Sequence, residues 1–177
     1  MKILATILLL FTINTMAAED HPIHKVPVPI PSEAFPSIIA FAYQSAMEIT
    51  GYDRNDFVKP GITVIPDSVM SQILKVPNNN QAYALYSYET NTIYINETSH
   101  KIPPILTAGL LVHEFVHYLQ FANGVDFTIC QQRKAAEVEA YKVQDMFLRK
   151  MGFPVNWQWP NLGMCEQEID QSYTVNF

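Results

Sequence analysis

Hydrophobic positions recur with a helical period in three segments of the chain. The first runs from Ser32 to Thr50, where apolar side chains return every three or four residues and form one broad face. The second runs from Pro103-Pro104 to about Asn123, and the third from about Gln131 to Met151. A glycine that suits a helix C-cap follows each segment: Gly51, Gly124 and Gly152. The pattern therefore predicts one N-terminal helix and a pair of later helices.

Between the first and second of these helices the period changes to that of strands. Residues 82–88 and 92–96 carry Tyr, Leu and Ile at alternate positions around a short polar connection, which predicts a β-hairpin. Residues 61–65 read as a further short strand, and a short helix begins at Asp67 or Ser68 and ends at Leu74. We therefore predict the α+β class, with a small sheet and no internal repeat.

Composition and charge narrow the class of protein. The chain has 177 residues, of which 49% are hydrophobic, enough for one domain with a substantial core. The formal net charge is −6, from 11 Lys and Arg against 17 Asp and Glu, so no basic surplus exists to neutralise phosphates. We therefore expect no nucleic-acid partner.

The N-terminus has the pattern of a cleavable secretory signal in residues 1–18. One lysine precedes an apolar run from Ile3 to Ile13, and small residues follow. The alternatives are a membrane anchor or a buried first helix, but the run spans only about 16 Å as a helix, half of a bilayer core. We predict no stable membrane span after signal removal. We predict that residues 19–31 form a proline-rich extended arm and that residues 32–177 form the single domain.

Export changes the interpretation of the two cysteines. In a secreted or periplasmic protein, Cys130 and Cys165 are expected to form a disulfide bond; the alternative is two buried thiols. The sequon Asn96-Glu97-Thr98 would matter only in a eukaryotic secretory pathway.

The segment His113-Glu114-Phe115-Val116-His117 is an H-E-x-x-H motif inside a strongly apolar helix. Side chains four residues apart lie on one face, so both imidazoles can bind one metal ion. Glu114 lies about 100° around the helix, beside the ion, where it can accept a proton from water that the metal activates. The alternative is two ordinary histidines and a surface carboxylate, which would bury polar groups without partners in this apolar run. The motif predicts a zinc site with Glu114 as the general base.

A catalytic zinc ion needs a third protein ligand, and the candidates are Glu137 and Glu139 in the following helix. If the two helices are antiparallel, His117 lies six residues before Asn123 and Glu137 six residues after Gln131. Both are then about 9 Å from the turn, whereas Glu139 overshoots by about 3 Å. The height of Glu137 along its helix, level with His117, therefore favours it over Glu139 as the third ligand.

The apolar stripe of the ligand helix favours the same residue. Glu137 lies about 60–70° from the centre of the stripe, and Glu139 about 100° away on the other side. We predict His113, His117 and Glu137 as the metal ligands, with Glu139 as the fallback; the alternative is that both glutamates are solvated. The stripe consists of Ala136, Ala140, Val143, Phe147 and Met151.

The ligand spacing, His113-Glu114-x-x-His117 followed after nineteen residues by Glu137-x-x-Ala140, resembles that of the gluzincin zinc metallopeptidases. The chain also resembles small secreted bacterial proteins with the same motif. The resemblance covers about a third of the chain and implies a zincin-like core with an active-site helix and an antiparallel glutamate helix. It also implies an edge strand that pairs with an extended peptide substrate, by analogy residues 92–96. The chain departs from the family in carrying Tyr141 where an acidic residue is usual.

These observations predict a secreted zinc-dependent hydrolase, a peptidase that acts on peptide or protein substrates with Zn²⁺ as cofactor. Two alternatives stay open: a zinc-containing binding or inhibitory module with little turnover, and an amidase that acts on a non-peptide or cell-wall amide. Three tyrosines are weak candidates to stabilise the oxyanion: Tyr118, Tyr141 and Tyr173. The sequence leaves cleavage specificity and oligomeric state open.

Overall fold

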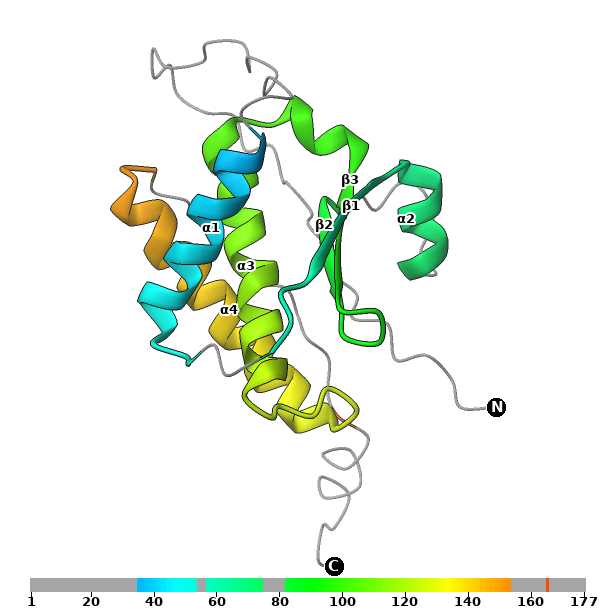
Figure 1. Cartoon of the computed structure of the whole chain (residues 1–177), viewed down its shortest axis with the longest axis vertical. Coiled ribbons are helices and arrows are strands. Elements are labelled where there is room, and N and C mark those ends of the chain that lie inside the picture. Colours follow the sequence, from blue (N-terminus) through cyan, green and yellow to red (C-terminus); the bar gives the residue numbers. More distant parts are fainter. Residues whose placement is uncertain (1–34, 54–56, 75–81, 154–164, 166–177) are drawn as a thin grey trace, which may run out of the picture.

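The computed structural model describes residues 35–53, 57–74, 82–153 and 165. Within them the chain is α+β, as the sequence predicts. Three helices lie together on one side of a small sheet, and a short helix lies on its other side (Figure 1). The signal and the arm predicted for residues 1–31 lie outside the described residues. The elements are α1 (Phe35–Thr50), β1 (Gly61–Ile65), α2 (Asp67–Leu74), β2 (Ala84–Ser87), β3 (Thr92–Asn96), the 3-10 helix η2 (Glu97–Lys101), α3 (Pro104–Ala122) and α4 (Cys130–Lys150).

The sheet has the strand order β1-β3-β2. β3 pairs in parallel with β1 and antiparallel with β2, with Tyr86 opposite Ile93 in the hairpin. The prediction of residues 92–96 as an edge strand is therefore wrong, because β3 is the central strand. β2 is the edge strand beside α3, since the parallel strand β1, which precedes the hairpin in the chain, pairs with the far side of β3.

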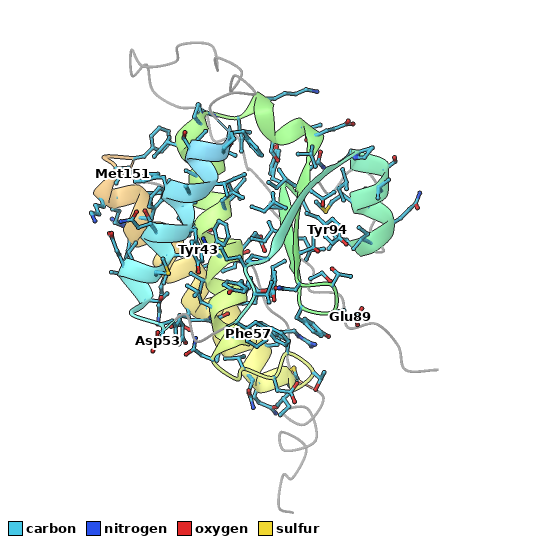
Figure 2. The ribbon with its side chains drawn as sticks, in the orientation of Figure 1. Tyr43, Asp53, Phe57, Glu89, Tyr94 and Met151 are labelled. Atoms are coloured by element: carbon cyan, nitrogen blue, oxygen red, sulfur yellow. A yellow bond between two sulfur atoms is a disulfide. The ribbon has the colours of Figure 1, made fainter. Side chains whose placement is uncertain are left out.

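The two faces of the sheet pack against different helices, as strand alternation requires. Ile93 and Ile95 of β3 belong to the main core with α1, α3 and α4, whereas Tyr94 points to the opposite face. There Tyr94 packs against a smaller cluster with Met70 and Leu74 of α2, and its side chain lies between the sheet and that helix (Figure 2). The sheet is thus covered on both faces, with the larger core beside α3.

The helices α3 and α4 approach each other closely along the main core. A Cβ built on Gly109 of α3 would lie 3.0–3.2 Å from the Leu148 side chain of α4, so a glycine allows this approach. Most of the apolar stripe predicted for α4 is buried here, including Ala140 and Phe147. Met151 is the exception: it lies just past the end of the helix and is 36% exposed.

The buried side chain of Asn96 joins three parts of the fold. Its amide nitrogen donates to the Asp67 carboxylate of α2 and to the Ala82 carbonyl, at 2.7 and 3.1 Å. Its oxygen accepts from the Thr98 backbone N–H and hydroxyl and so caps η2, which the sequence did not predict. Asn96 is 1% exposed, and its side-chain amide makes all the hydrogen bonds that it can. The asparagine of the sequon therefore has a structural role in the folded chain.

The predicted disulfide between Cys130 and Cys165 is confirmed. Cys130 is the first residue of α4, and Cys165 is buried. Among the described residues, no helix combines the length and apolar character needed to cross a bilayer.

Removal of this disulfide should lower the free energy of unfolding by about 3–4 kcal/mol, because it closes a loop of 35 residues. It should also weaken binding of the predicted zinc ion, since Cys130 is the first residue of the helix that carries Glu137. Chemical denaturation and zinc titration of a Cys130→Ser/Cys165→Ser double variant check both effects. Unchanged zinc affinity in this variant would contradict the second.

Candidate metal centre

The helix α3 is buried on every side from Thr107 to Gln120, and this places the H-E-x-x-H motif inside the protein. The side chains of His113, Glu114 and His117 are 0%, 1% and 1% exposed. Apolar residues such as Leu111 and Val116 make the helix a core element that packs against α1, α4 and β2. A core helix therefore holds three polar side chains that require partners.

His113, His117 and Glu137 come together, as the sequence predicts. Their ligating atoms all lie within 4.8 Å of one another, and all three residues are buried. The two Nε2 atoms are 3.0 Å apart. Each lies 3.5 Å from a different carboxylate oxygen of Glu137. Glu137 of α4 therefore lies level with the two imidazoles of α3, as predicted from its position in the helix.

The unpaired atoms of this cluster fit a bound cation. Neither oxygen of Glu137 has a hydrogen-bond partner, and 3.5 Å is long for a bond from an imidazole. A buried carboxylate without hydrogen bonds is unfavourable unless a charge compensates it. Two imidazole nitrogens and one carboxylate oxygen are a donor set that zinc accepts, so this buried group could hold a metal ion.

Glu114 faces the sheet edge beside the same cluster. Its Oε2 accepts a 2.7 Å hydrogen bond from the backbone N–H of Tyr86 in β2, and its Oε1 has no partner. Burial raises the pKa of Glu114, against the opposing charges of His113 and His117. The edge strand thus holds one oxygen in place and leaves the other available to accept a proton.

Charge coupling links the members of the cluster in the metal-free protein. Burial would lower the pKa of His117, but the Glu137 carboxylate beside it raises that pKa to about 9. Burial would raise the pKa of Glu137, but the two imidazoles hold it well below its usual range. Without metal, a proton on His117 therefore compensates the buried Glu137 charge.

This coupling predicts a pH dependence for the metal-free protein. A raised His117 pKa stabilises the fold fully below its unfolded value of 6.5, and this contribution is lost as pH rises to about 9. The lowered Glu137 pKa makes stability depend on pH only in the acid range, since its contribution is fully present above 4.5 and is lost as pH falls below that value. The free energy of unfolding, measured in chelator, should fall between pH 6.5 and 9, and the fall should shrink in Glu137→Gln. A flat profile in the unmodified protein would contradict this.

Glu139, the fallback ligand, is not one of the three residues whose ligating atoms cluster. Its Oε2 accepts hydrogen bonds from Gln120 at 2.8 Å and from the Tyr52 hydroxyl at 2.9 Å. Burial and this bond raise the pKa of Tyr52 to about 12. The reason is its position around α4, which turns the side chain toward the end of α1 and away from the imidazoles.

The sequence pattern did not predict a role for Gln120, which is fully buried and whose amide oxygen accepts a 2.9 Å hydrogen bond from Nδ1 of His117. The available signal was its position three residues after His117, on the same helical face of an apolar segment.

Of the two described tyrosines considered for the oxyanion, Tyr141 lies beside the cluster. Its ring centroid is 4.5 Å from that of His113, and burial, with the charges of Glu137 and Glu114, raises its pKa. Tyr118 points elsewhere, with its hydroxyl donating to the Phe57 carbonyl. Phe57 lies at the lower part of α3 (Figure 2). Tyr173 lies outside the described residues.

Comparison with known proteins places residues 49–170 in the family described as a domain of unknown function, DUF6647, and the chain belongs to that family. Searches of curated proteins and of solved structures find no match.

Proposed function

We propose that this member of the DUF6647 family is a zinc-dependent hydrolase, most simply a peptidase. One observation carries the proposal: His113, His117 and Glu137 direct ligating atoms at one point, and the Glu114 carboxylate lies beside them. Two imidazoles, one carboxylate and a nearby general base are the parts that zinc-assisted hydrolysis needs.

Zinc, when bound, supplies a Lewis acid that lowers the pKa of water and polarises a carbonyl. The chain supplies the rest. His113, His117 and Glu137 would hold the ion with a single negative charge, so the site keeps net positive charge. Glu114 would accept a proton at Oε1, the oxygen that has no hydrogen-bond partner, and return it to the leaving amine. The Tyr86 N–H would hold Oε2 throughout.

The arrangement of α3, α4 and the sheet supports a zincin-like interpretation of the fold. The gluzincin resemblance implies an edge strand that pairs with substrate, and in this chain that role would belong to β2. Tyr86 lies on the outer edge of β2, because its N–H turns away from β3 and bonds to Glu114. The disulfide supports the further proposal that the protein is secreted or periplasmic.

The burial of the site favours one competing function. All three proposed ligands are at most 4% exposed, whereas catalytic zinc keeps a position open to water and substrate. A zinc-containing binding or inhibitory module needs no such position. Measured turnover of a substrate would distinguish the hydrolase from the binding or inhibitory module.

The test is reconstitution of the purified protein. Protein stripped with a chelator should show no cleavage of an unfolded polypeptide, and one equivalent of zinc should restore it, with released amines as the readout. Zinc with heat-denatured protein serves as the control. Zinc-loaded, folded protein that releases no amines from polypeptides would contradict the peptidase proposal and leave the binding module.

A further inference from the structure

The buried amide of Gln120 has only one orientation compatible with its partners. Its Nε2 lies 2.9 Å from the Ala136 carbonyl oxygen, which can only accept a hydrogen bond, and 2.8 Å from the Glu139 carboxylate. Both amide hydrogens are therefore used on α4. The amide oxygen then faces Nδ1 of His117, 2.9 Å away.

This orientation shows that Nδ1 of His117 carries a proton. Because Oε1 of Gln120 can only accept, Nδ1 of His117 must be the donor. Nε2 is the nitrogen that faces His113 and Glu137, and it is the atom free to bind a metal. His113 differs: its Nδ1 is buried without a hydrogen-bond partner, so no such bond fixes its tautomer.

Gln120 is itself held by a second pair of contacts. Glu139 accepts from Gln120 and also from the hydroxyl of Tyr52, just beyond the end of α1. The chain of bonds thus runs from α1 through α4 to the ligand on α3. It gives Glu139, which is not among the three clustered ligands, a place behind the site.

We propose that Gln120 is a positioning residue for the metal centre, which holds His117 with Nε2 toward the ion, and that Glu139 and Tyr52 hold Gln120 in turn. The inference rests on the metal site of the proposed function but not on hydrolysis. Contacts of this kind behind a ligand are typically worth about 10–100-fold in metal affinity.

The first test is a measurement on the metal-free protein. In ¹⁵N-labelled protein, His117 should show an Nδ1–H signal protected from exchange with water, and Gln120→Leu should remove that protection. A His117 proton on Nε2 alone in the unmodified protein would overturn the inference.

The second test is zinc affinity, measured by competition with a chelator. Gln120→Leu should weaken zinc binding about 10–100-fold, and Glu139→Leu should also weaken it. Glu139→Gln should restore near-normal affinity, because its amide oxygen still accepts from Gln120 and Tyr52. The control is Gln44→Leu, which changes an exposed side chain of α1 that bonds Glu48 in the described part of the chain.

The outcomes of these tests distinguish a failure of this inference from a failure of the proposed hydrolase function. Folded Gln120→Leu and Glu139→Leu with unchanged zinc affinity would overturn the inference, even if hydrolysis were observed. If Gln120→Leu does not fold, the comparison of Glu139→Leu with Glu139→Gln decides, because equal affinities in the two would also overturn it. Zinc binding that depends on Gln120 in a protein without turnover would support the inference and refute the hydrolase.

Discussion

Replacement of Glu114 by Gln should lower hydrolytic turnover about 10²–10⁴-fold, the usual contribution of a general acid–base group, while zinc stays bound. The Glu114 carboxylate is held by the Tyr86 N–H on one oxygen and has no partner on the other. Glutamine keeps the size of the side chain and an oxygen that can accept from Tyr86, but it cannot accept a proton. The measurement pairs amine release with metal analysis of the same sample.

A matched control for this change is Glu89→Gln, in the turn between β2 and β3 (Figure 2). It makes the same chemical substitution on an exposed side chain and should leave turnover unchanged. Full activity in Glu114→Gln would remove Glu114 from the reaction. Loss of zinc together with activity would instead show that Glu114 supports the metal site.

The strands and the helices other than η2 could be predicted from local pattern, because strands and helices have different periods and a glycine follows each of the three long helices. Gly51, Gly124 and Gly152 take positive φ at the three predicted helix ends. The order of strands could not be predicted in this way. Nothing in the alternation of residues 92–96 distinguishes a central strand from an edge strand, and the parallel pairing with β1 depends on contacts distant in sequence.

The ligands could be predicted because two of them share one helix and the third follows a short loop, so helical geometry fixes their heights. The polar contacts behind the ligands could not be predicted from the sequence. Gln120 and Glu139 are positioned by the close packing of α3 against α4, and Tyr52 reaches Glu139 across 87 residues of sequence. A glutamate near an apolar stripe has the same sequence signature whether it binds a metal or holds the residue that orients a ligand.

The paired substitutions Glu137→Gln and Glu139→Gln separate those two roles. Structural zinc sites bind with about 10–16 kcal/mol shared among four ligands, so loss of one ligand's charge should weaken binding on the order of 10²–10³-fold. Glu137→Gln should show this loss, because its two oxygens each lie 3.5 Å from an imidazole nitrogen. Glu139→Gln should bind zinc almost as the unmodified protein does, because an amide oxygen can still accept from Gln120 and Tyr52.

The two variants change the same functional group two positions apart on one helix, so general effects on α4 cancel in the comparison. Titration against a competing chelator gives both affinities, and denaturation in chelator shows that both chains fold. Equal, small losses would mean that neither glutamate binds the ion. A larger loss in Glu139→Gln would exchange the two roles, and the orientation of Gln120 could then no longer explain why His117 presents Nε2.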